Sequence, residues 1–320
     1  MKEKQMKRHK IHRRKFTTMA DGTDAVLTIH ELQGAGSGPT VGISASIHGN
    51  ENVGSQIVRA IWPQLLEAEI SGRLLVMPVA NPRAFAVNRR FTPIDELNLN
   101  RQFPGSDSGC FSDHLAAAIT REFLEKIDIH IDLHAGTDRP TVDYVYIMNN
   151  ERLSRAFGSR VLYRPRQGLG GTSYQGTTKT VTVDQRGISS IVVELGGGIV
   201  AQEPYVSRGC DGVINILRAA GSLAGEPAPP PPQIVVGGIE IVRPKQGGWL
   251  ETEAPPLGEE IGDGAVLGRV VSPYTFEELE VIQSPVKRGI MILSHLNRNL
   301  VEPGDYGYMV GDMETAEESR

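Results

Sequence analysis

A proline run at residues 226–233, EPAPPPPQ, divides this sequence into two parts with different patterns. Consecutive prolines lack amide hydrogens and favour a stiff, extended chain, so this stretch fits neither a helix interior nor a central strand. Before it, apolar runs alternate with helix-like segments, which predicts an α/β domain with a largely parallel sheet. After it, short runs punctuated by Gly and Pro predict a small all-β domain.

The alternation before the proline run can be followed segment by segment. Residues 52–70 carry apolar side chains at helical spacing, although Pro63 should kink that helix. Ser112 or Asp113 is the expected N-cap of the next helix. The strand-like runs lie at 39–49, 72–81, 128–136 and 188–198, and the helix-like segments lie at 52–70, 112–127 and 209–225.

The composition is typical of a globular protein without a membrane span. The 320 residues carry a formal net charge of −5. No apolar run approaches the roughly 18 residues that a transmembrane helix requires. The two cysteines, Cys110 and Cys210, are too few for a disulfide framework or a four-cysteine zinc site. We therefore expect a cytoplasmic protein with reduced thiols and no membrane partner.

The N-terminus is strongly basic. Residues 1–15 hold eight Lys or Arg and one Glu, and no apolar segment follows that would make them a secretory signal. A basic arm can bind nucleic acid, but the rest of the chain is acidic and shows no nucleic-acid-binding motif. We therefore expect residues 1–20 to be a flexible, solvated segment, and we expect no nucleic-acid partner.

Three predicted strands end in residues that bind metals or transfer protons. The segments SIHGNE, IDLHAG and VVELGG bring His48 and Glu51, His134, and Glu194 to strand ends. Ligands of open α/β sheets bind beyond the carboxyl ends of the strands. A catalytic zinc takes three protein ligands of these types, and a further carboxylate off the metal can deprotonate water. Singly, each histidine is more often a core or loop residue and Glu51 a helix cap, but the four together favour a metal site.

A long segment at residues 81–105 separates the first two of these strand ends. It shows no regular period, and loops of this length are usually functional or disordered. Its arginines are of the type that binds carboxylates in two-pronged fashion and stabilises oxyanions. For Arg83 and Arg89 simple solvation of the surface is the expectation, whereas Arg90 and Arg101 gain a role from the resemblance described next.

The motifs HGNE, NP followed by an arginine loop, LNRQFPG, DLHAG and VELG occur in one order along the chain. In this order they resemble the aspartoacylase and succinylglutamate desuccinylase family, a branch of the zinc carboxypeptidase-like metallohydrolases. The likeness covers roughly residues 40–220 and, more loosely, the C-terminal region, and points to the bacterial deacylase branch. It implies a mixed, largely parallel sheet flanked by helices, plus a small C-terminal domain similar to a barrel-sandwich.

The resemblance also implies roles for individual residues. It implies one Zn²⁺ per chain, held by His48, Glu51 and His134. Glu194 would be the general base and acid. By the same likeness, Arg90 would polarise the scissile carbonyl, and Asn100 with Arg101 would bind the α-carboxylate of a small N-acyl amino acid whose amide bond is hydrolysed.

Two further features of the sequence bear on the implied metal ligands. Family members commonly read DLNR where this chain has Asn98 before Leu-Asn-Arg, which removes an acid that could contact a metal ligand. Asp132 lies two residues before His134, on the same side of a strand, and either orients that ligand or forms a structural salt bridge. An Arg and a Tyr of the family's pocket have no clear equivalent here. Tyr163, Arg164 and Arg166 are candidates, with a solvated loop the more common interpretation.

The predicted organisation places the zinc hydrolase domain at 21–225, the linker at 226–233, the β domain at 234–312 and a tail at 313–320. We interpret the β domain as a lid or an oligomerisation element, and we expect a homo-oligomer. Two alternatives to a deacylase stay open. One is a zinc carboxypeptidase that cleaves short peptides, and the other is a non-catalytic binding protein on the same fold.

Overall fold

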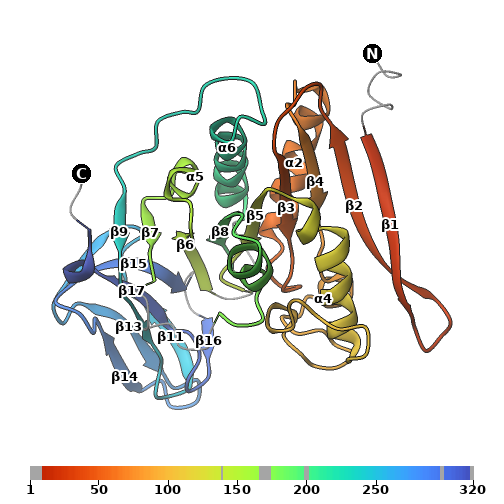
Figure 1. The fold of residues 1–320 in the computed structure, drawn as a ribbon. Helices are drawn as coiled ribbons and strands as arrows, with labels where there is room; N and C mark the ends of the chain where they lie inside the picture. The colour runs from red at the N-terminus through yellow and green to blue at the C-terminus, as the bar shows by residue number, and fades with distance from the viewer. Residues whose placement is uncertain (1–8, 138–139, 166–173, 198–201, 296–298, 318–320) are drawn as a thin grey trace.

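The computed structural model describes residues 9–137, 140–165, 174–197, 202–295 and 299–317 (Figure 1). Its larger sheet follows the order β1-β2-β4-β3-β5-β8-β6-β15-β17-β10, with β7, β9 and β12 attached at its side, and its smaller sheet follows β14-β13-β11-β16. The strands are β1 (His9–Thr18), β2 (Asp24–Gln33), β3 (Thr40–Ala45), β4 (Arg73–Met77), β5 (Ile129–His134), β6 (Pro140–Ile147), β7 (Val161–Tyr163), β8 (Ser189–Gly196), β9 (Ile234–Val236), β10 (Ile239–Val242), β11 (Gly248–Thr252), β12 (Glu260–Gly262), β13 (Val266–Val271), β14 (Glu278–Gln283), β15 (Arg288–His295), β16 (Asn299–Val301) and β17 (Tyr308–Asp312).

The helices are α2 (Val53–Glu67), α3 (Pro82–Ala86), α4 (Phe111–Glu122), α5 (Glu151–Ala156) and α6 (Glu203–Ala219), with short 3-10 helices η1 (Leu99–Arg101), η2 (Leu124–Lys126) and η4 (Met313–Thr315) and a π-helical turn η3 (Thr180–Gln185).

The centre of the large sheet is parallel, as the sequence predicts. Strands β4, β3, β5 and β8 are parallel neighbours, and they are the four runs predicted before the proline run. Antiparallel strands flank them: β2 pairs with β4 on one side, and β6 pairs with β8 on the other. The structure therefore confirms the mixed α/β class.

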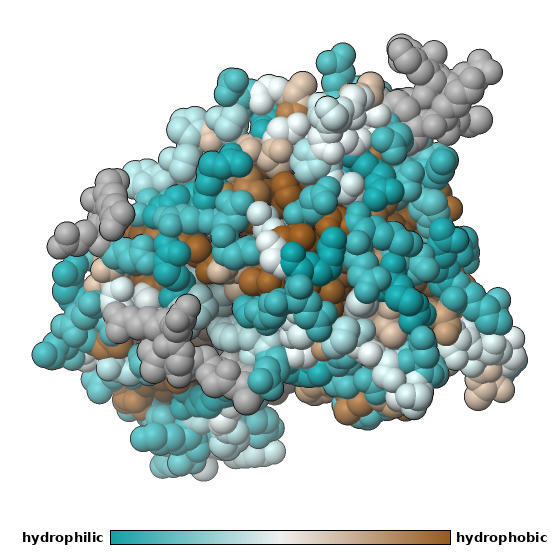
Figure 2. Space-filling view, in the orientation of Figure 1, coloured by the Kyte–Doolittle hydropathy of each residue, from teal (hydrophilic) through white to brown (hydrophobic). Residues whose placement is uncertain are grey.

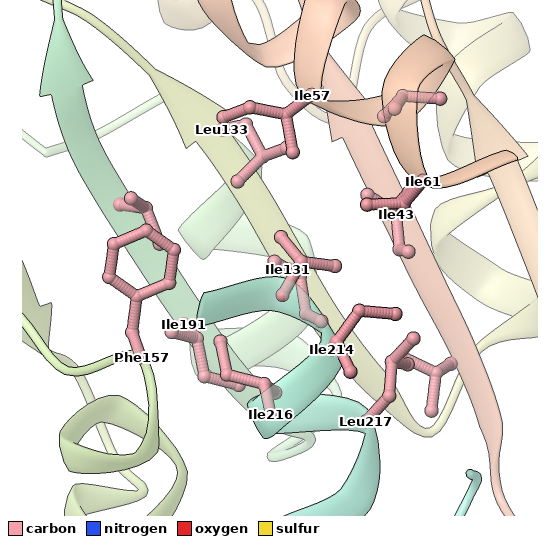
Figure 3. Close-up of a cluster of buried hydrophobic side chains, with 14 of the residues drawn as sticks. Ile43, Ile57, Ile61, Ile131, Leu133, Phe157, Ile191, Ile214, Ile216 and Leu217 are labelled. Atoms are coloured by element: carbon pink, nitrogen blue, oxygen red, sulfur yellow. The ribbon is translucent and has the colours of Figure 1, made fainter. Parts of the chain in front are cut away.

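The two faces of this sheet have different compositions because alternate strand residues point to opposite sides. One face carries Ile131 and Leu133 of β5 and Ile191 of β8, which pack under α2 and α6 in the cluster shown in Figure 3. The opposite face carries His130, Asp132 and His134 from β5 and Glu194 from β8. A second apolar cluster, built around α4, covers part of that face. The candidate site residues of the central strands thus lie on one face of the sheet.

Two predicted helix starts differ from the structure, and a third helix holds in its interior the proline expected to kink it. Helix α6 begins at Glu203 rather than near residue 209, with a proline in its first turn, a position that needs no amide hydrogen. Helix α4 begins after Cys110, whose amide donates to the Asp113 carboxylate at 3.1 Å, so neither Ser112 nor Asp113 is the N-cap. Helix α2 continues through Pro63.

The segment at residues 81–105, expected to lack its own structure, contains two short helices. Asn81 caps α3 by accepting the Ala84 amide at 3.2 Å, and the proline that follows it opens the helix. The LNR motif forms the 3-10 turn η1. The N-terminal segment also differs from the expectation of a flexible tail, because residues 9–18 form strand β1 at the edge of the large sheet, antiparallel to β2.

The C-terminal region is less separate than the sequence suggests. Strand β15 pairs with β6, so the large sheet runs on from the first region into the second. The four-stranded sheet packs against this extension across one apolar cluster, in which Leu250 and Val270 from the small sheet meet Met291 and Val310 from the large one. A sandwich therefore forms after the proline run, and residues 226–233 contain no helix or strand.

The molecular surface is polar over most of the face in Figure 2, with scattered apolar residues between hydrophilic ones. Among the described residues, no helix combines the length and apolarity that crossing a membrane requires.

Candidate metal centre and substrate site

Parallel pairing brings the predicted strand ends together. His134 is the last residue of β5 and lies in register with Glu194 of β8. His48 follows β3, the other neighbour of β5, and the Glu51 amide donates to the His48 carbonyl at 3.1 Å, which closes a tight turn. Gly49 is required in this turn, since a Cβ there would lie 2.0 Å from the carbonyl carbon of Ala84.

His48, Glu51 and His134 form one buried cluster. Nδ1 of His48 lies 2.8 Å from Oε1 of Glu51, and Nδ1 of His134 lies 2.9 Å from Oε2 of the same carboxylate. All three candidate ligand atoms lie within 4.8 Å of one another, and the three residues are at most 5% exposed. The sequence-predicted ligands therefore converge.

The second ring nitrogen of each histidine is held by an acceptor. Nε2 of His48 lies 3.0 Å from Oδ1 of Asn98, an oxygen that also accepts the Asn100 amide at 2.9 Å. Nε2 of His134 lies 3.3 Å from Oδ2 of Asp132. Because both Nε2 atoms donate, the neutral rings would present bare Nδ1 lone pairs to the Glu51 carboxylate. A cation bound between the two Nδ1 atoms and the Glu51 carboxylate would remove this repulsion. Two imidazole nitrogens and one carboxylate are ligands that suit Zn²⁺.

The electrostatics of the cluster differ between its two histidines. Burial disfavours the charged form of His134, but the carboxylates of Asp132 and Glu51 outweigh it and raise the pKa of His134 well above its usual value. Burial likewise opposes ionisation of Glu51, yet the two histidines hold its pKa well below the usual range. Burial lowers the pKa of His48, so positive charge is favoured at His134, between the Asp132 and Glu51 carboxylates, and not at His48.

Asn98 stands where the family's DLNR pattern has an aspartate, and it contacts His48. Its amide oxygen occupies the contact to His48 that a carboxylate could make, so the departure preserves the hydrogen bond and removes one negative charge. Asp132, in turn, is no isolated salt-bridge partner: besides His134 it accepts Ser44 Oγ at 2.6 Å, and it is 1% exposed.

Glu194 lies beside the cluster without belonging to it. It is in register with His134 on one side and with Tyr144 on the other. Burial raises the pKa of Glu194 to about 8. A carboxyl group with this pKa exchanges its proton near neutral pH, as a general base and acid must.

Arg89 is a surface residue, as the sequence predicted. Arg89 pairs with Glu96 at 3.2 Å on the surface, where both side chains are more than half exposed. Arg90 instead reaches the cluster, and its Nη1 lies 2.6 Å from Oε1 of Glu51. Arg101 is on η1 with Asn100, and its Nη1 donates to the Asn100 carbonyl at 2.6 Å.

A cluster of four tyrosines extends from Tyr144, which lies opposite Glu194 in the sheet, and of these the sequence indicated only Tyr163. Tyr144 donates to the hydroxyl of Tyr146 at 3.1 Å, and the ring of Tyr146 lies 5.4 Å from that of Tyr163 and 6.2 Å from that of Tyr174. Burial raises the pKa of Tyr144 and Tyr146 well above the usual value, so both remain neutral phenols. The alternation in VDYVYI, which puts both on the face of Glu194, was the available signal.

The candidates for the remaining pocket positions differ in their contacts. Arg164 forms ion pairs with Glu151 at 2.6 Å and Glu317 at 2.5 Å, which is a structural arrangement. Tyr163 belongs to the tyrosine cluster. Arg166 lies outside the described residues.

Fold and cluster together define a mixed α/β protein with a buried His-Glu-His group that could hold a metal ion, at the carboxyl edge of its parallel strands. The chain belongs to the succinylglutamate desuccinylase/aspartoacylase family, whose catalytic-domain model matches residues 37–220.

Individual relatives agree with this assignment. An N-alpha-acetyl-L-2,4-diaminobutyric acid deacetylase from Halomonas elongata is 27% identical over 252 residues, which cover 73% of this chain and 71% of the relative. The crystal structure of a succinylglutamate desuccinylase from Silicibacter sp. TM1040 shares the fold with a TM-score of 0.80 at 24% identity, covering 97% of this chain and 94% of that one. The product-bound ectoine utilization protein EutE (DoeB) from Ruegeria pomeroyi gives 0.81 at 23% identity, covering 95% and 94%.

Proposed function

We propose that this protein is a zinc-dependent amidohydrolase that removes the acyl group from a small N-acyl amino acid. The observation that carries the proposal is the pair of histidine Nδ1 atoms that converge on Glu51 while both Nε2 atoms donate elsewhere. The relatives named as a deacetylase and a desuccinylase support the reaction class.

His48, Glu51 and His134 would hold one zinc ion per chain. When bound, zinc activates water and polarises the amide carbonyl as a Lewis acid. Glu194, next to the cluster in the sheet, would take the proton from water and return it to the leaving amine. Nη1 of Arg90 lies 2.6 Å from Oε1 of Glu51, and because the Arg90 side chain is 36% exposed, its guanidinium would be able to donate to an oxyanion.

Asn100 and Arg101 would bind the α-carboxylate of the substrate. They are adjacent on η1, which the Asn98 side chain caps and ties to His48. This connection supports a fixed distance between the carboxylate site and the metal ligands. The tyrosine cluster would contact the rest of the substrate, since it lines the side of Glu194 away from His134.

A hydrolysis screen tests the proposal. N-acetyl-2,4-diaminobutyrate, N-acetylaspartate, N-succinylglutamate and short peptides would each be incubated with the zinc-loaded protein, and free amine would be measured. We expect release from at least one N-acyl amino acid, abolished by chelator and restored by zinc. Cleavage of peptides alone would identify a carboxypeptidase. Zinc binding without hydrolysis of any substrate would favour a binding protein.

A further inference from the structure

Thr178 is a buried residue, 3% exposed, that contacts both halves of the site. It precedes η3, where its carbonyl accepts Thr182 Oγ1 at 3.0 Å. Its hydroxyl donates to Oδ2 of Asp132 at 2.8 Å, and its backbone amide donates to Oδ1 of Asn100 at 3.1 Å. A single residue therefore bonds the acid behind a metal ligand and the side chain proposed to bind substrate.

On the metal side, the Thr178 hydroxyl and the ring of His134 share one carboxylate oxygen. His134 Nε2 lies 3.3 Å from Oδ2 of Asp132, the atom that also accepts Thr178. The other oxygen, Oδ1, accepts Ser44 Oγ at 2.6 Å. With a donor on each oxygen, the carboxylate cannot turn without breaking a buried hydrogen bond, which leaves a donor unsatisfied. The orientation of His134 thus depends on Thr178 and Ser44.

On the substrate side, Thr178 fixes which end of the Asn100 amide faces outward. Because Oδ1 accepts the Thr178 amide, Nδ2 remains as the donor for a carboxylate. The same segment docks on η1 through its backbone: the Phe103 amide donates to the Gly176 carbonyl at 2.9 Å. A Cβ on Gly176 would lie 2.3 Å from the Arg101 carbonyl oxygen, and its φ of +69° also favours glycine.

We propose that Thr178 is a positioning residue that holds the substrate-carboxylate group, Asn100, in fixed relation to the metal ligand His134. The part that concerns Asn100 rests on the proposed function. The part that concerns His134 rests only on the hydrogen bonds to Asp132. Loss of the Thr178 hydroxyl removes its bond to Asp132 directly, and it reaches Asn100 only by releasing the segment whose backbone amide holds that side chain. Loss of the Ser44 hydroxyl removes the other bond to Asp132 and a 2.8 Å contact with His130, and leaves the Asn100 contact in place.

The test compares T178V, T178S and S44A with a control, T141V. Thr141 is also a buried threonine, but its hydroxyl donates to the Ser294 carbonyl of β15. Zinc affinity would be measured by chelator competition without substrate, and KM and kcat with the best substrate of the screen. T178V should bind zinc about tenfold more weakly, the lower end of what loss of a supporting partner costs, and should raise KM. S44A should weaken zinc with little change in KM, and T178S and T141V should resemble the parent.

Parent-like zinc affinity and KM in T178V would overturn the proposal, as would a T178S variant as impaired as T178V. If no substrate is hydrolysed, the proposed function fails, but the zinc measurements on T178V, T178S and S44A still decide whether Thr178 supports His134. Should T178V fail to fold, the smaller variant T178A decides that point by the same zinc measurement, because T178A must weaken zinc while T178S must not.

Discussion

Replacing Asn98 by alanine removes the acceptor that holds the His48 ring. The Nε2–H of His48, which is 3% exposed, then loses its 3.0 Å partner. An unsatisfied buried donor costs about 1–3 kcal/mol, so the metal-free protein should lose stability of that order. Without the acceptor the ring is also free to change tautomer and orientation. Zinc affinity should consequently fall about 10–100-fold, the usual effect of removing such a partner.

The matched variant N98D restores the acid that the family pattern carries. It keeps the hydrogen bond and makes it charge-assisted, and such bonds are roughly twice as strong as neutral ones. We therefore expect N98D to bind zinc several-fold more tightly than the parent, with N98A the weakest of the three. Chelator competition and unfolding in urea, with and without zinc, measure both effects. An N98A variant with parent affinity, or an N98D variant weaker than the parent, would refute the assignment of Asn98 as the partner of His48.

Two further substitutions test the surroundings of the site. G49A should abolish zinc binding or folding, because the added Cβ would lie 2.0 Å from the Ala84 backbone. Zinc content and circular dichroism would distinguish the two losses. A folded G49A that binds zinc would show that the turn tolerates a side chain. R89A should leave kcat/KM unchanged and alter stability by less than about 1 kcal/mol, since its ion pair with Glu96 is exposed, and a loss of activity would mean that Arg89 acts in the site.

The convergence of the candidate metal ligands could be predicted from sequence because it follows from topology. Carboxyl ends of adjacent parallel strands meet at one edge, so His134 and Glu194 had to be close once both strands were recognised. His48 follows β3, the other neighbour of β5, and shares a tight turn with Glu51. The short spacing in sequence therefore already places these two residues together.

The supporting contacts could not be predicted, because they join segments far apart in the chain. Asn98 reaches His48 across 50 residues, and Thr178 reaches Asp132 across 46 and Asn100 across 78. Neither loop has a period that determines its path. The continuation of the large sheet into the C-terminal region could not be predicted for the same reason, because the pairing of β15 with β6 depends on where the whole sandwich docks.

Strand β1 was missed for a different reason. Its basic side chains resemble those of a solvated tail, yet they occupy an edge strand with one neighbour. Charged residues, especially Lys, are common on edge strands because they discourage pairing with other chains. A charge run next to a predicted sheet is therefore weak evidence of flexibility.

The most direct test of the central claim is the zinc content and turnover of E194Q beside the parent protein. The parent should hold one zinc per chain and release amine from an N-acyl amino acid. E194Q should hold the same zinc, because Glu194 lies outside the ligand cluster, and should lose about 10²–10⁴-fold in kcat, the contribution of general acid–base catalysis. A fully active E194Q, or a parent that binds no zinc, would contradict the account.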